Sequence, residues 1–130
     1  MYLLDTNTLI YFFKGMGNVA EILLAKSPKD ISIPSISLYE LEVGIAKSNR
    51  PEKRKKQLES LVSRIAVSTF ASKEAEVAAM IRAELENNGT PIFPYDNFIA
   101  GIALSSTAIL VTHNTKEFSR VEGLYLEDWF

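Results

Sequence analysis

Acidic side chains stand at three junctions of this sequence, each where an apolar segment meets the start of a helix-like pattern. Asp5 directly follows the apolar run 2–4, and Glu40 and Asp96 each fall within the first turn of a later apolar-patterned segment. Carboxylates held about 4 Å apart repel by about 4 kcal/mol per pair at an effective dielectric of about 20, so a fold that gathers three of them requires a cation. Because these side chains supply only oxygen ligands, a hard cation such as Mg²⁺ or Mn²⁺ is expected. The pattern predicts a carboxylate metal site.

Each of these acids also has a purely structural interpretation. Acidic residues favour helix N-termini because the helix macrodipole places partial positive charge there. Ser37 and Glu40 additionally match the S-x-x-E capping box, in which both side chains bind backbone N–H groups of the first turn. Taken singly, Asp5, Glu40 and Asp96 are each explained as helix caps. Their convergence in the folded chain is what would distinguish a metal site from three unrelated caps.

Composition limits the chemistry that the chain can perform. Its 130 residues are expected to form one domain, residues 1–130, with a full hydrophobic core. There is no cysteine, which excludes disulfides, thiolate metal sites and cysteine nucleophiles; His113 is the only histidine, which excludes catalysis by a histidine pair. The opening residues 1–10 are too short and too acidic for a signal peptide, and no apolar run approaches the roughly 20 residues of a membrane helix. We therefore expect a cytoplasmic protein without a membrane partner.

The charge distribution allows two interpretations. A net charge of −2 argues against binding of nucleic acid through the overall field of the protein, because domains that bind in this way are usually basic. One short segment is nevertheless crowded with basic residues: Lys47, Arg50, Lys53, Arg54, Lys55 and Lys56. Such a run is more often a solvated helix surface that serves solubility. The alternative is that it meets phosphates.

Apolar runs alternate with helix-like segments along the whole chain. Strands are predicted at residues 2–5, 31–33, 65–68, 108–111 and 124–126, and helices at 7–14, 18–26, 37–48, 51–63, 72–88 and 95–105. Continuous apolar strands that are separated by helices indicate a parallel sheet covered on both faces. The fold class is therefore α/β with a central parallel sheet.

Such a sheet would bring the three acids to one edge. Ligands of open parallel sheets bind outside the carboxyl ends of the strands. Asp5 and Asn114 follow two predicted strands directly, and Glu40 opens the helix that leaves a third. Asp96 needs the extended segment 89–94, which can span roughly 20 Å, to return the chain to that edge. All three carboxylates can then converge.

Four segments of the sequence, taken together, resemble the PIN-domain ribonucleases of the VapC toxin type. The segments are Tyr2 to Ile10 around Asp5-Thr6-Asn7, Ile36 to Gly44 around Glu40-Leu41, Gly89 to Ala100 around Asp96, and Leu110 to Phe118 around His113-Asn114. No single motif is specific, but four in this order span the chain from end to end. The resemblance implies a three-layer α/β/α domain that hydrolyses RNA, often transfer RNA, with Mg²⁺ or Mn²⁺. It also implies neutralisation by a cognate VapB-type antitoxin and a homodimer.

Carried over position by position, the resemblance assigns metal binding and catalysis to Asp5, Glu40 and Asp96. Glu42 is not assigned, because Glu40 holds the family's E-L-x-x-G register. The fourth acid of many PIN domains falls at Asn114 here, which puts a fully occupied second metal position in doubt. Asn114 can still serve as an auxiliary group through its amide oxygen.

Other polar residues are expected around these ligands. The residues expected to support the metal ligands are Thr6, Asn7, Ser37 and Thr112. Glu117 is a poorly placed substitute for the missing acid, and His113 should point to the side opposite Asn114 if that segment stays extended. A face of small residues at Ala75, Ala79 and Ala83 suits close helix packing, either inside the fold or across a homodimer.

Two other functions remain open. An aspartyl phosphatase also begins with an apolar strand that ends in Asp, but it requires a second Asp where this chain has Asn7, and the further Lys and acidic pair are not found. A non-catalytic binding module that keeps a PIN-like shell is suggested only by the missing acid at Asn114. Trapping of a phospho-aspartate would favour the first alternative, and absence of divalent-dependent RNA cleavage the second.

Overall fold

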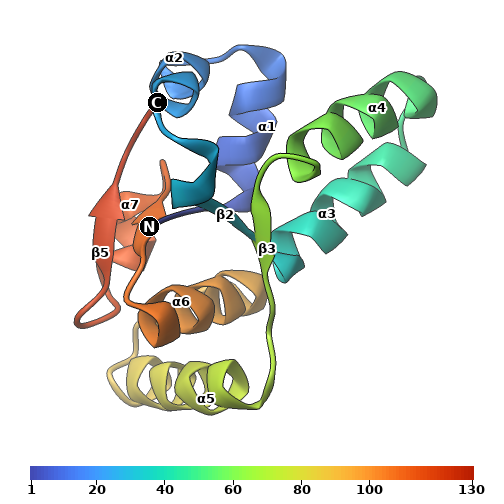
Figure 1. Ribbon diagram of the computed structural model, residues 1–130. Coiled ribbons are helices and arrows are strands. Elements are labelled where there is room, and N and C mark those ends of the chain that lie inside the picture. Colours follow the sequence, from blue (N-terminus) through green and yellow to red (C-terminus); the bar gives the residue numbers. More distant parts are fainter.

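Five short strands form one parallel sheet at the centre of the molecule (Figure 1). A computed structural model describes all 130 residues, and its strands are β1 (Tyr2–Leu4), β2 (Ile31–Pro34), β3 (Ala66–Ser68), β4 (Ile109–Val111) and β5 (Tyr125–Glu127). The spatial order is β3-β2-β1-β4-β5, and every neighbouring pair is parallel. Tyr2 of β1 lies opposite Ile31 on one side and Ile109 on the other. The predicted parallel sheet is confirmed, with β1 in the middle.

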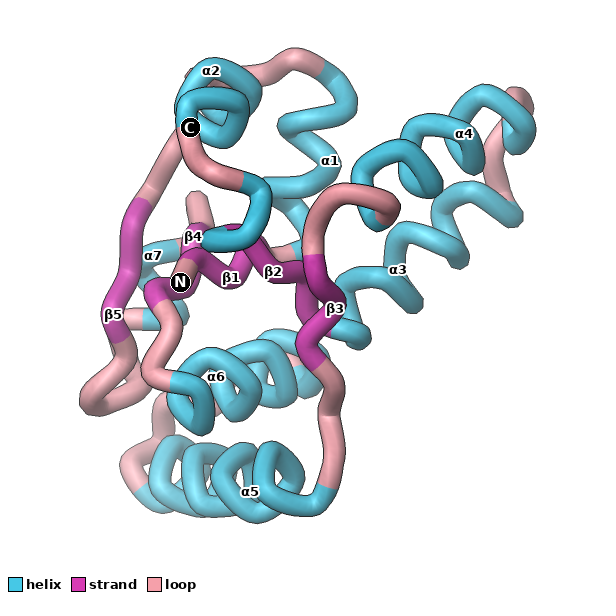
Figure 2. Tube along the Cα trace, viewed as in Figure 1, coloured by secondary structure: helices cyan, strands magenta, loops and turns pink.

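Helices cover both faces of this sheet. They are α1 (Thr6–Lys14), α2 (Val19–Ala25), α3 (Ser35–Ala46), α4 (Pro51–Val62), α5 (Ser72–Asn87), α6 (Pro94–Ser106) and α7 (Thr115–Phe118), with a short 3-10 helix η1 (Pro28–Asp30) before β2. Figure 2 shows α1 and α2 on one side of the strands and α5 and α6 on the other, while α3 and α4 form an arm beside α1. The three-layer α/β/α architecture is confirmed. No single helix is long and apolar enough to cross a membrane. The sharply bent pair α1 and α2 reaches that length and composition only when both helices are taken together.

The two sides of the sheet bury separate hydrophobic clusters. Successive side chains of a strand point to opposite faces. Accordingly, Leu4 belongs to the cluster that contains Leu9, Val19 and Leu58, whereas Leu3 belongs to the cluster formed with α5 and α6. Both leucines are fully buried. The residue that follows them, Asp5, is therefore fixed at the end of the central strand.

Helix α6 is held closely against α5. A Cβ atom on Gly101 would lie 2.7 Å from the Cβ of Ala78, so glycine is what allows this approach. The buried side chain of Asn97 donates a 2.8 Å hydrogen bond from Nδ2 to the carbonyl of Ala78. The small residues of α5 that face elsewhere are exposed, namely Ala75, Ala79 and Ala83. This alanine face is thus not used for packing inside the fold.

One predicted helix begins two residues early, and one short helix was not predicted. The helix expected from residue 37 begins at Ser35, directly after Pro34, because proline ends the strand and its fixed backbone leads into the helix. Ser37 consequently lies within the first turn, buried, and α3 has no side-chain cap. A four-residue helix, α7, follows Asn114, where no helix was predicted.

Candidate active site

Asp5 is the most enclosed of the predicted ligands. Its side chain is 4% exposed, and its backbone N–H donates to the carbonyl of Val111, which continues the β1–β4 ladder by one residue. Oδ1 accepts a 2.9 Å hydrogen bond from the N–H of Thr8 and caps α1, while Oδ2 accepts a 2.6 Å hydrogen bond from Oγ1 of Thr112. Burial raises the pKa of Asp5, and the hydrogen bonds from Thr112 and Thr8 oppose that rise.

Glu40 is positioned by a side chain of α1 and not by a capping box. Oγ1 of Thr6 donates a 2.7 Å hydrogen bond to Oε1 of Glu40 and lies 2.9 Å from Oγ of Ser37. The capping-box interpretation was wrong because the helix starts two residues earlier than expected, which turns Ser37 towards Thr6. The structural explanation that competed with a ligand role for Glu40 is therefore removed.

Asp96 lies half-buried in the first turn of α6, beside the anchored Asn97. Desolvation by burial, followed by the charges of Asp5, Glu117 and Glu40, raises the pKa of Asp96 to about 6. Three other carboxylates from separate elements thus act on this carboxyl group. The charges of Asp5 and Glu40 reach Asp96, as expected if the sheet topology brings these acids to one edge, and the charge of Glu117 acts on it as well.

Glu117 reaches this group through α7. Asn114 precedes α7, and its Nδ2 donates a 3.0 Å hydrogen bond to Oε2 of Glu117, while its backbone N–H donates to Oγ1 of Thr112. Glu117 was expected to be poorly placed as a substitute ligand, but the helical turn of α7 brings it near enough for its charge to raise the pKa of Asp96. Four residues are too few to show a helical periodicity, so no pattern in the sequence revealed this turn. Asn114 is placed to orient Glu117.

Aromatic rings flank two of the acids. Tyr39 precedes Glu40 and Tyr95 precedes Asp96, and the two rings meet edge to face with centroids 5.9 Å apart. Tyr39 is largely exposed, so this contact lies at the surface where α3 and α6 approach one another. It ties together the two helices that carry Glu40 and Asp96.

The remaining predicted residues lie differently. Asn7 is exposed and makes no side-chain hydrogen bond within the protein, whereas Glu42 forms an ion pair with Lys55. His113 is exposed; its Nδ1 lies 2.9 Å from Oδ2 of Asp128, and its ring stacks on Phe130 with centroids 4.3 Å apart. No pattern in the sequence indicated a role for Asp128, whose charge also acts on Asp5. Its position depends on the pairing of β5 with the sheet edge.

This arrangement suits a hard cation. None of Asp5, Glu40, Asp96 and Glu117 forms an ion pair with a basic side chain. No three acidic side chains stand close enough in this structure to enclose one ion. The donor set of carboxylates and one amide nevertheless matches the oxygen ligands that Mg²⁺ and Mn²⁺ accept. A divalent ion would compensate charges that the protein itself leaves unpaired.

Known proteins resemble this chain over nearly its whole length. The model of the PIN domain family matches residues 2–124. The tRNA(fMet)-specific endonuclease VapC of Shigella flexneri is 40% identical over 128 residues, which cover 98% of this chain and 97% of that protein. The protein of the same name from Salmonella typhimurium strain LT2 is 38% identical with the same coverage. The crystal structure of DNA-bound VapBC from Salmonella typhimurium contains a chain that superimposes with a TM-score of 0.92, at 38% identity, covering 99% of this chain and 98% of that one.

Proposed function

This chain belongs to the PIN domain family, and we propose from that premise that residues 1–130 form one Mg²⁺- or Mn²⁺-dependent endoribonuclease, the toxin of a toxin–antitoxin pair. The observation that carries the metal-dependent chemistry is the group of unpaired acids at the carboxyl edge of the sheet. Asp5, Glu40 and Asp96 are the proposed metal ligands, and Glu117 is a further acid beside them. The reaction is hydrolysis of RNA phosphodiester bonds.

The residues divide the work in this proposal. Bound among the acids, the divalent ion supplies a water nucleophile at neutral pH and offsets negative charge on the phosphate. Thr112 and the N–H of Thr8 each bind one oxygen of Asp5, and Thr6 binds one oxygen of Glu40, so these hydrogen bonds would orient the two carboxylates that hold the ion. Asn97 fixes the turn that presents Asp96. The protein has no histidine in hydrogen-bond contact with these acids, and the acids bind and orient without attacking the substrate themselves.

Substrate and partners follow from the relatives. Their names describe endonucleases specific for tRNA(fMet), and the similar solved chain lies in a complex named VapBC. We propose that this chain likewise cuts transfer RNA and is silenced by a cognate VapB-type antitoxin. The site of action is then the cytoplasm, where transfer RNA is found. A homodimer remains our prediction, and the exposed alanine face of α5 is one surface that it can use.

The two alternatives are less well supported. An aspartyl phosphatase needs a second acid at the position of Asn7, which is exposed and makes no side-chain hydrogen bond. A non-catalytic module was suggested only by the amide at Asn114, and Glu117 now supplies an acid next to that residue. Neither alternative accounts for the acids gathered from β1, α3, α6 and α7.

Cleavage of transfer RNA by three proteins tests the proposal. Wild type, Asp5→Asn and Glu42→Gln are each incubated with unfractionated tRNA and Mn²⁺, and the products are resolved on denaturing gels. We expect Asp5→Asn to lose cleavage by at least about 100-fold, because metal-site substitutions commonly cost 10- to 100-fold in affinity or activity even outside the ligands themselves. Glu42→Gln should remain active, since Glu42 pairs with Lys55 away from the site.

Thermal melting gives a second readout that does not depend on the substrate. A ligand that binds only the native state stabilises it by RT ln(1 + [L]/Kd), about 2.7 kcal/mol at a hundredfold excess over Kd. Mn²⁺ should therefore raise the melting temperature of the wild type and hardly that of a protein carrying Asp5→Asn and Asp96→Asn together. An equal rise in both proteins would locate the ion elsewhere and contradict the assigned ligands.

A further inference from the structure

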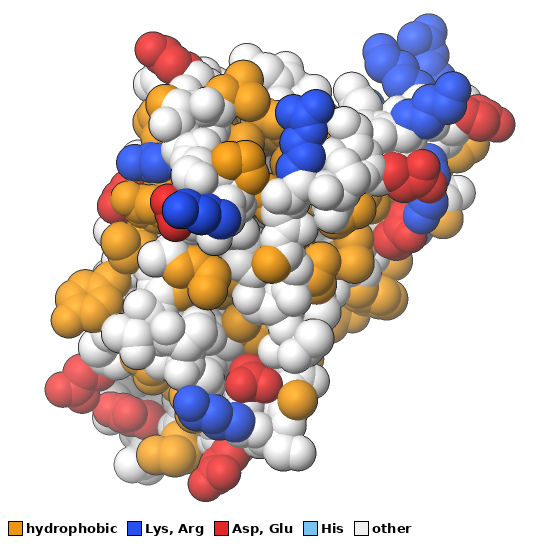
Figure 3. All heavy atoms as spheres, in the orientation of Figure 1, with side chains coloured by type: hydrophobic (Ala, Val, Ile, Leu, Met, Phe, Trp, Pro, Cys, Tyr) orange, Lys and Arg blue, Asp and Glu red, His pale blue; other side chains and the backbone are white.

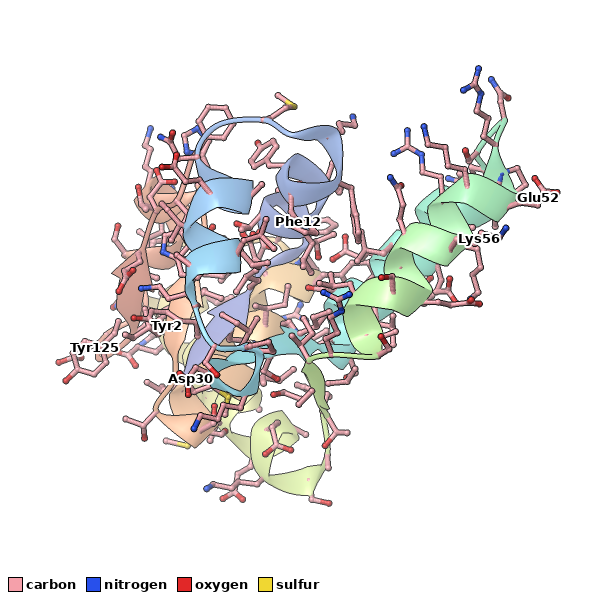
Figure 4. The ribbon with its side chains drawn as sticks, turned by 45° about the horizontal axis from the view of Figure 1, so that its top comes forward. Tyr2, Phe12, Asp30, Glu52, Lys56 and Tyr125 are labelled. Carbon is pink, nitrogen blue, oxygen red and sulfur yellow. The ribbon has the colours of Figure 1, made fainter.

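The basic segment 47–56 is divided by the fold into two different surfaces. On α4, Lys53, Arg54 and Gln57 are spaced so that they share one side of the helix, and Arg50 caps its start. The acids of α4, Glu52 and Glu59, fall on other sides at 100° per residue. Figure 4 shows Glu52 and Lys56 on the side of α4 that is turned away from α1.

The side that bears Lys53 and Arg54 borders a polar cleft between α4 and α1. The cleft has a volume of about 470 Å³; its lining includes Lys14, Arg50, Lys53 and Arg54, no acidic residue, and Phe13 as its single hydrophobic residue. None of these four basic residues forms an ion pair, whereas Lys55 is paired with Glu42. Figure 3 shows Lys and Arg side chains gathered over the far end of the arm formed by α3 and α4.

This basic cleft continues towards the acids. A second hollow of about 330 Å³ has Glu40 in its wall. Five residues line both spaces: Phe13, Lys14, Ser48, Arg54 and Gln57. The two spaces thus adjoin, so a patch of unpaired positive charge lies next to a hollow that reaches a proposed metal ligand, and Phe13 lines both.

We propose that the cleft lined by Lys14, Arg50, Lys53 and Arg54 binds the phosphodiester backbone of the RNA substrate and leads it to the acids. The inference rests on the proposed ribonuclease function, which it deepens by naming the residues that hold the substrate. Basic grooves track the backbone of single-stranded nucleic acid, and a nearby aromatic ring can contact the bases.

Charge explains why RNA needs such a surface on this protein. The chain has a net charge of −2, and four acids stand at the reaction centre, so the overall field repels a polyanion. Attraction must come from a local group of cations close enough to the acids to deliver a phosphate to them. The four cleft residues meet this requirement because they are unpaired, exposed and continuous with Glu40.

Binding of unfractionated tRNA without metal tests the proposal. Every protein carries Asp96→Asn and a chelator is present, so that no cleavage occurs, and affinity is measured by fluorescence anisotropy between about 50 and 200 mM salt. The cleft variant is Lys53→Gln with Arg54→Gln. Its matched control, Lys55→Gln with Lys56→Gln, removes the same charge from other sides of the same helix. Lys14→Gln probes the α1 wall of the cleft independently of α4.

We expect the cleft pair to weaken binding at least tenfold at low salt. It should also reduce the slope of log K against log salt by about 1.4, since each phosphate contact to single-stranded nucleic acid contributes about 0.7. Lys14→Gln should reduce that slope by about 0.7, and the control pair should change neither affinity nor slope beyond experimental error. Circular dichroism melting checks that all variants are folded.

Two results would overturn the proposal. Equal weakening by the cleft pair and the control pair would mean that tRNA senses only total charge. Unchanged tRNA binding by both the cleft pair and Lys14→Gln would show that the cleft does not bind RNA. Failure of the ribonuclease function has a different signature, namely intact tRNA after incubation of wild type with Mn²⁺, and it leaves the metal-free binding data interpretable.

Discussion

The hydroxyl of Thr112 donates a 2.6 Å hydrogen bond to Oδ2 of Asp5 and joins the ends of two neighbouring strands across 107 residues of sequence. The hydroxyl oxygen of Thr112 also accepts a hydrogen bond from the backbone N–H of Asn114. The buried side chain of Thr112 therefore links β1, β4 and the start of α7. This link sets the orientation of the most enclosed acid of the site, and it can be removed without changing any charge.

Thr112→Val should therefore show how much the orientation of the Asp5 carboxylate contributes to metal binding when no charged residue is removed. Valine keeps the shape but leaves a buried carboxylate oxygen and an N–H group without their partner, which costs about 1–3 kcal/mol of stability. The pKa of Asp5 should rise further, because a hydrogen bond that opposes the effect of burial is lost. We expect divalent affinity, measured by calorimetric titration of Mn²⁺, to fall about 10- to 100-fold. Thr90→Val, which removes only a weak bond to Leu85, should leave it unchanged.

Metal binding should weaken below about pH 6. Asp96 must be ionised to bind a cation, and its pKa is raised to about 6 by burial and by the neighbouring acids. The apparent Kd for Mn²⁺ should increase about tenfold for each pH unit below that value. In an Asp96→Asn protein this part of the pH dependence should be absent. An identical pH profile in both proteins would show that another group controls binding.

Without metal, the same shift should make the wild type less stable as pH rises. A raised pKa means that the native state binds the proton more tightly than the unfolded state, whose carboxyl pKa is 3.8. The stabilising contribution is then complete below about pH 4 and is lost as pH rises through about 6. In thermal melting with a chelator present, the stability of Asp96→Asn relative to the wild type should increase as pH rises from about 4 to about 6. A gain of the same size at every pH would contradict the role of ionisation.

Substitutions of Glu117 and Asn114 should show that Glu117, and not residue 114, contributes negative charge to the metal site. Glu117→Gln removes one of the charges that raise the pKa of Asp96, so that pKa should fall, and Mn²⁺ affinity should drop because ligand charge determines affinity for hard cations. Asn114→Asp replaces a 3.0 Å hydrogen bond with repulsion between two carboxylates. We expect it to lower stability without metal and to leave Mn²⁺ affinity no higher than in the wild type. A marked increase in affinity would instead make residue 114 a direct ligand position.

Gly101→Ala should destabilise the fold and disturb the site indirectly. The added methyl group would lie 2.7 Å from the Cβ of Ala78, and separation of α6 from α5 should cost about 1–3 kcal/mol. Because Asp96 lies on α6, Mn²⁺ affinity should decrease as well. Gly44→Ala is the matched control, since a Cβ there meets nothing within 4 Å on an ordinary helix. It should stabilise the protein by about 0.5–1 kcal/mol.

Patterns that extend over many residues predicted the fold, but they did not predict where individual helices begin or how single turns place their side chains. Apolar runs between helices identified all five strands and their parallel arrangement, and sheet topology was enough to bring Asp5 and Asp96 together. The S-x-x-E pattern at Ser37 and Glu40 misled because Pro34 had already set the start of the helix. The position of Glu117 depends on a single turn of helix, and the basic cleft depends on where α4 lies relative to α1. Neither leaves a periodic signal in the sequence.

The central position of β1 also determines when the molecule can become active during its synthesis. β1 leaves the ribosome first, yet its neighbour β4 begins at Ile109, and the hydrogen bond that orients Asp5 comes from Thr112. Translation adds about 5–20 residues per second, so synthesis of the chain through α5 takes several seconds. The chain at that point contains neither Asp96 nor Thr112. The growing chain therefore stays inactive on the ribosome until nearly the whole sequence has been translated.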